Sequence, residues 1–457
     1  MDSARCDVLI QNAHVITFDD AGTSVPDGAI AVLDGRIVDV GPTNELQQRW
    51  SPDRRVFASG KIAMPGLTDA HFHTAQTMMR GLLAHLRTQG ALRVPTWREY
   101  LVPFESALTP DDVELSGLLA YSTMLRTGTT SFFESGGPHP ERMAAAAITT
   151  GIRGSVALST MDGGSRIPAN MLMTTEEALT RNIELVEAFP SAADGSTRVT
   201  AGMALRQIIV CSPELVRDLH HEARSRGVKV HTHLVEGTYE IDYALERYGH
   251  RPVDYLVDLG VFTDTLHGAH SILVDDRDID RFAAAGVSAA HCAKGNYSIG
   301  VPPALRMWRR GVSIGLGTDG VGVLGTLDLF RVAMLTAVGQ QFVEATPVHN
   351  RNGVEPSEPL AMAARGGARA MGIGEHTGSL EVGKQADVLL LRTDGPDAAA
   401  FASPEAFLYE AASGRDVDTV FVAGEQVVSD GVVTTVDADD IARRAAGRQA
   451  ELATAIA

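Results

Sequence analysis

Hydrophobic and polar positions along the middle of the chain follow two alternating periods. Short apolar runs, typical of buried strands, begin near Gly66, Thr129, Gly154, Val199, Val228, Thr265, Val287 and Val312. Longer stretches with a helical period lie between them, such as 109–127, 176–189 and 213–226. Eight strands that alternate with helices predict a (β/α)8 TIM barrel of the α/β class. In this fold the active site lies at the carboxyl ends of the strands.

The two ends of the chain have a different pattern. Residues 7–13 and 29–40, and later 386–392 and 418–424, have the composition of strands, with a hairpin signal at Asp34-Gly35. Strand-rich segments at both ends predict one small β-sandwich formed by both termini. We expect residues 1–63 to form its first part, 64–372 the catalytic barrel, 373–435 its second part, and 436–457 a closing helix.

Composition narrows the range of partners. The 457 residues carry a formal net charge of −18, which disfavours nucleic acid and acidic membranes as partners. The three cysteines, Cys6, Cys211 and Cys292, lie far apart, which excludes a cysteine zinc cluster and fits a reducing compartment. There is no run of 18 apolar residues and no basic segment followed by an apolar one at the start. We therefore expect a cytoplasmic protein that acts on a small molecule.

The clearest chemical signal lies at residues 64–74, where a Pro-Gly turn leads into an apolar segment that ends with His71 and His73. Side chains two apart on a strand point the same way, so both imidazoles would lie side by side at the strand's carboxyl end. The spacing alone is weak evidence, since a second such pair exists at His231 and His233. The pair is half of a metal site if other strands supply the rest.

Other predicted strands end in groups of the same kind. The fifth strand gives His233 and Glu236, the sixth His267 and His270, the seventh His291, and the eighth Asp319. Imidazole and carboxylate ligands suit Zn²⁺ or a similar divalent ion, which lowers the pKa of water to about 7 and makes it a nucleophile. Glu236 is then the natural carrier of a proton to the leaving group.

The motif Pro-Gly-Leu-x-Asp-Ala-His-x-His at residues 65–73 resembles the first-strand signature of the amidohydrolase superfamily. The resemblance covers nearly the whole chain, including the split β-domain. The motifs His-Leu-Val-Glu at 233–236 and Gly-Thr-Asp-Gly at 317–320 resemble its deaminase and chlorohydrolase branch. That branch includes cytosine, guanine and adenosylhomocysteine deaminases and the s-triazine hydrolases.

The resemblance implies roles for individual residues. It implies His71, His73, His233 and Asp319 as the ligands of one metal. It implies Glu236 as proton shuttle, His267 as the residue that orients the hydroxide or polarises the substrate, and Asp319 as acceptor of the water's proton. It implies substrate contacts for His291, Gln76, Trp97 and His270, although a helix surface or a loop cap would also explain the last three. His231 is expected to be structural.

Two-metal members of the superfamily carry a bridging carboxylated lysine, usually after the fourth strand. The only lysines here are Lys61, Lys229, Lys294 and Lys384, and none lies near residues 203–205, where that strand should end. The chain therefore resembles the members with one divalent metal ion, Zn first, with Fe, Mn or Co as alternatives. By analogy with the family we expect a homo-oligomer.

Two loops depart from the deaminase pattern. The branch's Ser-His-Asn-Pro-x-Ser-Asn motif is replaced at 290–296, and its Ser-Asn pair after the eighth strand is replaced by the apolar stretch 321–326. Both loops would shape the substrate pocket, and the apolar one suggests a less polar substrate. We expect a metal-dependent hydrolase that uses an activated water to cleave a C–N bond, a deaminase of an N-heterocycle. Alternatives are an amide, urea or carbamate hydrolase, a chlorohydrolase, and a non-catalytic assembly protein.

Overall fold

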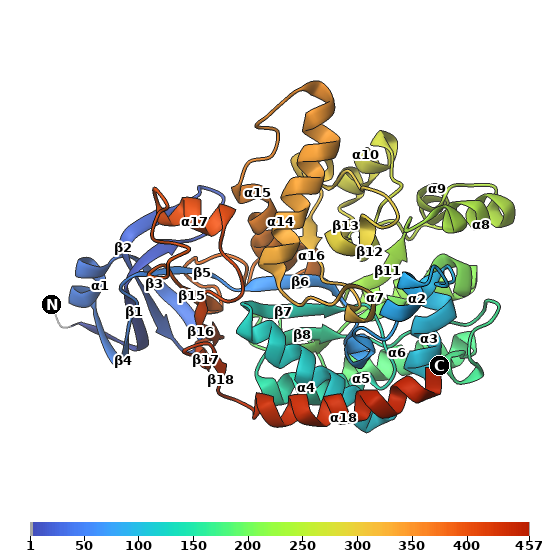
Figure 1. Ribbon diagram of the computed structural model, residues 1–457, viewed down its shortest axis with the longest axis horizontal. Coiled ribbons are helices and arrows are strands. Elements are labelled where there is room, and N and C mark those ends of the chain that lie inside the picture. The colour runs from blue at the N-terminus through green and yellow to red at the C-terminus, as the bar shows by residue number, and fades with distance from the viewer. Residues whose placement is uncertain (1–2, 457) are drawn as a thin grey trace.

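The computed structural model describes residues 3–456, which form a barrel beside a smaller β-domain (Figure 1). The barrel strands are β6 (Leu67–Phe72), β7 (Thr129–Glu134), β8 (Arg153–Val156), β9 (Val199–Ala201), β10 (Met203–Leu205), β11 (Val230–Leu234), β12 (Leu266–His270), β13 (Ser288–His291) and β14 (Ile314–Leu316). They pair in parallel as β6-β7-β8-β9 and β10-β11-β12-β13-β14. The predicted (β/α)8 barrel is confirmed, with each strand close to its expected position.

The fourth strand is split, and hydrogen bonds between β6 and the residues after β14 close the barrel. β9 pairs with β8 and β10 with β11, and Gly202 alone separates the two halves. Between β14 and β6, the Thr318 backbone N–H and hydroxyl donate to the Asp69 carboxylate at 3.1 and 2.5 Å. The Asp319 N–H donates to the carbonyl of His71 at 2.9 Å. These bonds hold the first and eighth strand ends together.

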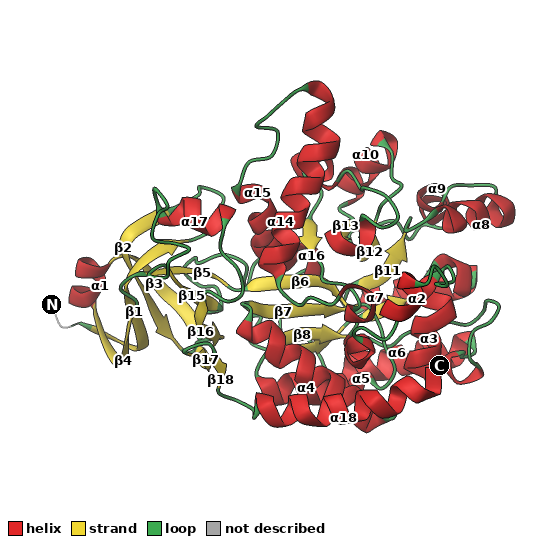
Figure 2. Cartoon of the chain, viewed as in Figure 1, coloured by secondary structure: helices red, strands yellow, loops and turns green. Residues whose placement is uncertain are grey.

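Helices surround the barrel strands (Figure 2). The longer ones are α4 (Pro110–Arg126), α5 (Pro140–Thr150), α6 (Thr175–Ala188), α7 (Pro213–Ser225), α8 (Thr238–Tyr248), α9 (Pro252–Asp258), α10 (Asp276–Ala285) and α14 (Leu329–Gln340). The shorter ones are α2 (Ala84–Thr88), α3 (Val102–Ser106), α11 (Ala293–Asn296), α12 (Ala304–Arg309), α13 (Val321–Leu324), α15 (Ser357–Ala361) and α16 (Gly367–Met371). Single turns are η1 (Thr74–Met79), η2 (Trp97–Leu101), η3 (Ala169–Met171), η4 (Ile208–Val210), η5 (Gln341–Ala345), η6 (Thr346–Val348) and η7 (Met362–Gly366). Capping boxes at Thr109, Thr174 and Asp275 fix where α4, α6 and α10 begin.

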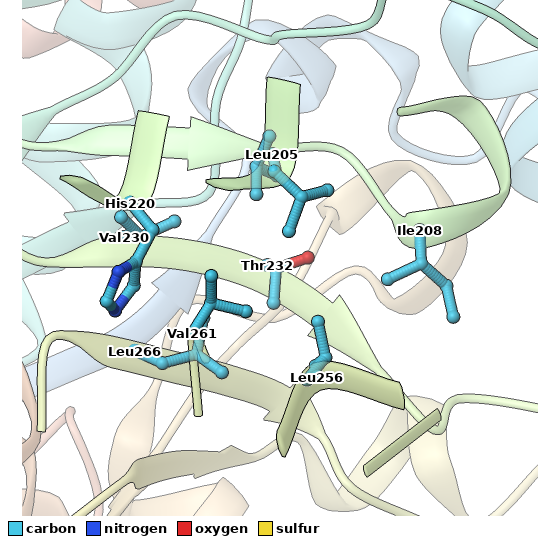
Figure 3. Close-up of a pocket in the computed structure, with 9 residues that line it drawn as sticks. Leu205, Ile208, His220, Val230, Thr232, Leu256, Val261 and Leu266 are labelled. Atoms are coloured by element: carbon cyan, nitrogen blue, oxygen red, sulfur yellow. The ribbon is translucent and has the colours of Figure 1, made fainter. Parts of the chain in front are cut away.

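Side chains on β11 alternate between two environments. Thr232 points into the apolar layer between the strands and the helices, beside Leu205, Val230 and Leu256 (Figure 3). Its neighbours on the strand therefore point to the opposite side, into the barrel. This register brings both His231 and His233 to the barrel interior.

The β-domain is built from both termini, as predicted for the small β-sandwich, and its strands pair into one continuous sheet. Its strands are β1 (Ala4–Ile16), β2 (Ser24–Leu33), β3 (Arg36–Pro42), β4 (Trp50–Phe57), β5 (Lys61–Pro65), β15 (Val388–Arg392), β16 (Val417–Val422), β17 (Glu425–Ser429) and β18 (Val432–Val433). The order is β18-β17-β16-β15-β5-β1-β2-β3, with β4 paired to β1. The antiparallel pair β5–β15 joins the two halves of the chain. The exact boundaries 1–63, 64–372, 373–435 and 436–457 stay a prediction.

The remaining helices are α1 (Thr43–Arg49), α17 (Pro404–Glu410) and α18 (Ala438–Ile456). α18 lies along α4 (Figure 1), where Arg448 donates to both oxygens of Asp112 at 2.7 and 3.0 Å. A buried ion pair between Arg153 of β8 and Asp387, just before β15, ties the barrel to the β-domain. Of the helices in the described residues, none is long and apolar enough to cross a bilayer.

Candidate metal centre

Four buried or half-buried side chains meet at the carboxyl ends of three barrel strands. His71 is the next-to-last residue of β6 and His73 directly follows that strand. His233 lies on β11, and Asp319 lies three residues beyond β14. One ligand nitrogen from each of the three histidines lies within 4.8 Å of the others. Oδ1 of Asp319 lies 3.4 Å from Nε2 of His71 and 3.7 Å from Nε2 of His73. The structure thus brings together all four residues predicted as metal ligands.

Hydrogen bonds at Nδ1 fix which ring nitrogen carries the proton in two of these histidines. Nδ1 of His233 lies 2.7 Å from the Arg206 carbonyl, which can only accept, so this nitrogen carries the proton. Nδ1 of His73 lies 2.8 Å from Oγ of Ser135, whose hydroxyl donates to the Phe72 carbonyl at 3.0 Å. Ser135 therefore accepts from His73. In both rings the Nε2 lone pair is left to face the cluster, as a metal ligand requires.

His231 contacts the Nδ1 atom of His71. Nδ1 of His71 lies 2.8 Å from Nε2 of His231, and the ring centroids are 5.0 Å apart. Nε2 of His71 is buried and has no hydrogen-bond partner within the described part of the chain. A buried imidazole nitrogen that faces a carboxylate without a bond is satisfied by a cation between them. A structural role for His231 stays a prediction.

The shifted pKa values of the clustered side chains favour the binding of a cation. Burial lowers the pKa of His71 to about 4 and the pKa values of His73 and His233 well below the ordinary value. Burial alone would raise the pKa of Asp319, but the close approach of His71 and the other nearby imidazoles lowers it below its usual range. Neutral imidazoles and an ionised carboxylate form the donor set that Zn²⁺ prefers, so the residues present fit such an ion.

The backbone is strained at these strand ends. Val235, His270, Ser271 and Asp319 all have positive φ, at 51°, 72°, 44° and 59°. Such angles are rare outside glycine, above all for a β-branched residue like Val235, and they cluster at functional sites. Gly317 is required for another reason, because a Cβ there would lie 2.9 Å from Cβ of His71. This close approach explains the first glycine of the Gly-Thr-Asp-Gly motif.

Glu236 follows the strained Val235 and is held by its neighbours. The Tyr239 hydroxyl donates to its Oε2 at 2.6 Å. Its backbone N–H donates to Oε2 of Glu240 at 3.0 Å, and Gln207 Nε2 lies 3.5 Å from the Glu236 carboxylate. Glu236 is half-buried. The side chain is thus anchored and still partly exposed, as suits a proton carrier.

The two histidines of β12 have different surroundings from those predicted. Nε2 of His267 lies 3.0 Å from the Ala70 carbonyl and Nδ1 lies 2.9 Å from Oγ of Ser288, so both nitrogens bond within the barrel wall. His270 lies against the cluster, with ring centroids 4.9 Å from His71 and 5.3 Å from His233. This geometry does not support the catalytic role predicted for His267.

The residues predicted to contact the substrate are all buried, but they differ in their hydrogen-bond partners. His291 is buried, with Nε2 3.3 Å from the Tyr297 hydroxyl and Nδ1 3.2 Å from the Asn296 amide. Gln76 is buried and donates to Glu105 at 2.7 Å, while its Oε1 has no partner in the described residues. Trp97 is buried on η2, and no described ring contact or hydrogen bond joins it to the cluster.

Sequence reasoning missed a buried ion pair beside the metal ligands. Nη1 of Arg206 donates to both oxygens of Glu105 at 3.1 and 3.2 Å, and both side chains are almost completely buried. Nη2 of Arg206 has no partner among the described residues. Arg206 directly follows β10, so the strand-end rule could have found it if cations had been included in the search.

Comparisons with known proteins agree with this geometry. A model of the amidohydrolase family matches residues 62–427. The chain is 32% identical to a 5-methylthioadenosine/S-adenosylhomocysteine deaminase of Desulforudis audaxviator, over 96% of this chain and 97% of the relative. It is 29% identical to a 5'-deoxyadenosine deaminase of Methanosarcina mazei, over 98% of each. A crystal structure of an adenosine deaminase from Xanthomonas campestris with bound zinc superposes with a TM-score of 0.90 at 26% identity, covering 99% of this chain and 100% of that one.

Proposed function

The chain belongs to the amidohydrolase family, and on this premise we propose that it deaminates 6-aminopurine nucleosides with an uncharged 5′ group. It is a metal-dependent hydrolase of carbon–nitrogen bonds in small molecules, in the deaminase branch. The buried cluster of three neutral imidazoles and one carboxylate, with Glu236 anchored nearby, is the observation that carries the proposal. The names of the relatives favour an adenosine-type substrate.

We assign the metal ligands as His71, His73, His233 and Asp319 and expect one Zn²⁺ per chain. When bound, the metal acts as a Lewis acid that makes water nucleophilic near neutral pH. A single ion is supported by the lysines. Lys61 bonds to Asp418, and Lys229 bonds to the Asp264 carbonyl. Lys384 bonds to Ser379 and to the Gly374 carbonyl, and Lys294 lies exposed on α11. We therefore expect none of the four to bridge two metal ions.

The chain's own residues then move protons and charge. A C6–O bond forms from water, the C6–N bond breaks, and ammonia leaves. Of the two protons of the water, Asp319 accepts one and passes it to ring nitrogen N1, and Glu236 takes the other and delivers it to the departing amino nitrogen, so the 6-oxopurine and ammonia account for both. His270 replaces His267 in the polarising role, because its Nδ1 lies 2.9 Å from Oδ1 of Asn296, which accepts and so leaves Nε2 for the reaction.

Substrate contacts are proposed for Gln76 and Arg206, because Oε1 of Gln76 and Nη2 of Arg206 are buried without a partner among the described residues. A contact is also proposed for His291, which bonds to Asn296, the residue that also holds His270. The apolar loop at α13 supports a 5′ group without charge, since Val321 is buried there. Three expectations stay predictions: that Trp97 contacts the substrate, that the protein is a homo-oligomer, and that it is located in the cytoplasm.

Measurement of nitrogen release tests the proposal. Zinc-loaded enzyme is incubated with adenosine, 5′-deoxyadenosine, an adenosine 5′-phosphate, and a panel of ureas, carbamates and anilides, with Glu236→Gln as control. Ammonia from the first two, absent in the control and weaker for the phosphate, supports the assignment. An organic amine from a urea, carbamate or anilide without ammonia from any purine would replace it with acyl–nitrogen hydrolysis.

A further inference from the structure

Five arginines line a cavity of about 520 Å³ away from the metal cluster. We call it the arginine pocket and define it by Arg80, Arg126, Arg331, Arg392 and Arg415. It lies where the barrel meets the β-domain, between the end of α4, the start of α14, and the residues flanking β15 and β16. In a chain with a net charge of −18, such a gathering of one positive charge type is unusual.

Among the residues that the structure describes, most of these guanidinium groups have no anionic partner. Arg392 lies 3.5 Å from Asp418, which Lys61 also contacts. Within residues 3–456, the side chains of Arg80, Arg126, Arg331 and Arg415 make no ion pair. Nε of Arg80 is buried without any hydrogen-bond partner in that range, which leaves an unsatisfied cation in the wall.

The acidic residues in the wall do not neutralise this charge. Asp328 accepts from the backbone N–H groups of Phe330, Arg331 and Gly414 at 3.0, 3.4 and 3.3 Å, so its oxygens are engaged as a helix cap. Asp430 is contacted by the Ser429 hydroxyl at 3.3 Å. Five arginines against two aspartates leave the cavity positive, and like charges around one cavity repel one another.

We propose that the arginine pocket binds the phosphate group of a small phosphate ester. Guanidinium forks match phosphate oxygens with paired, charge-assisted hydrogen bonds. Among the described wall residues none is aromatic, so a purine or pyrimidine ring would find no stacking partner. A compact ligand dominated by its phosphate therefore fits better than a nucleotide. The inference does not depend on the deaminase activity.

Calorimetric titration of the full-length, zinc-loaded protein at low ionic strength tests this. The probes are glycerol 3-phosphate, inorganic phosphate and ATP, with glycerol as the uncharged match. Glycerol 3-phosphate is expected to bind once per chain with a Kd below about 1 mM, and glycerol not at all. In the double variant Arg126→Gln/Arg331→Gln the affinity should fall at least about tenfold, since two charge-assisted contacts are lost.

Arg351→Gln is the matched control, because Arg351 is exposed, forms no ion pair among the described residues and lines a different cavity next to α14. It should bind glycerol 3-phosphate like the unchanged protein. Absence of saturable binding to the unchanged protein would overturn the proposal. Full affinity in the double variant would also overturn it, since the phosphate would then sit elsewhere, as at the metal. Binding of ATP tighter than of glycerol 3-phosphate would refute the preference for a small ester.

Discussion

Replacing Ser135 by alanine tests whether the histidine tautomers are set by the contacts behind the metal ligands. Oγ of Ser135 accepts from Nδ1 of His73 at 2.8 Å while its own proton goes to the Phe72 carbonyl. In the variant the N–H of a completely buried ring loses its acceptor, which costs about 1–3 kcal/mol of folding free energy in the metal-free protein. The ring is also free to move its proton to Nε2, where it blocks the metal.

Loss of such a contact typically weakens metal binding about 10- to 100-fold, or about 1.4–2.7 kcal/mol. We expect this loss for zinc in Ser135→Ala, measured by competition with a chromophoric chelator, with urea unfolding of the metal-free protein in parallel. Ser131→Ala is the matched control, since Ser131 is buried on β7, the strand that Ser135 directly follows, and its hydroxyl has no partner within the described residues. Unchanged zinc affinity in Ser135→Ala, or an equal loss in Ser131→Ala, would refute the reasoning.

Four further predictions follow from particular contacts. Glu236→Gln should lower kcat by about 10²–10⁴-fold with zinc content unchanged, as measured by ammonia release and metal analysis; activity within tenfold would remove Glu236 from proton transfer. His270→Asn should lower kcat/KM by about 10²–10³-fold, whereas His267→Asn should mainly lower the melting temperature, and the reverse pattern would restore the role to His267. Arg153→Met should lower the free energy of unfolding by about 3–5 kcal/mol, because Asp387 stays buried without its cation; a loss below 1 kcal/mol in urea denaturation would show that the ion pair is dispensable. Burial raises the pKa of Glu240 to about 8, so the folded protein binds this proton more tightly than the unfolded chain, and the free energy of unfolding should fall as pH rises from about 4.5 to 8. Glu240→Gln should remove roughly 2–4 kcal/mol of that fall between pH 5 and pH 8, and an unchanged pH slope would contradict the account.

Local pattern was enough to predict the barrel and the convergence of polar side chains at its strand ends, whereas the choice of four of them as metal ligands depended on the family resemblance. The apolar runs, the strand period of two and the position at a strand's carboxyl end placed His71, His73, His233 and Asp319 together before any coordinates. The roles of these residues remain proposals, but their meeting point follows from register alone.

The sequence could not decide between His267 and His270, because the choice depends on where β12 ends. His270 is the last residue of β12 and has a φ of 72°, and no pattern in the sequence signals this turn of the backbone. The Arg206–Glu105 pair joins residues 101 positions apart, which local periodicity cannot show. Strand β4 was also missed, since its Ser-Pro-Asp-Arg-Arg segment is mostly exposed at the edge of the sheet and has no apolar alternation.

The central claim is that water replaces an amino group at the carbon that the metal cluster faces. The most direct measurement is the reaction of zinc-loaded enzyme with 5′-deoxyadenosine in water enriched in heavy oxygen, with the product analysed by mass spectrometry and ammonia counted in the same sample. The account predicts a deaminated product that carries one heavy oxygen on the purine ring and one ammonia per product. Ammonia without heavy oxygen in the ring, or an unchanged purine under conditions where another C–N substrate is cleaved, would contradict it.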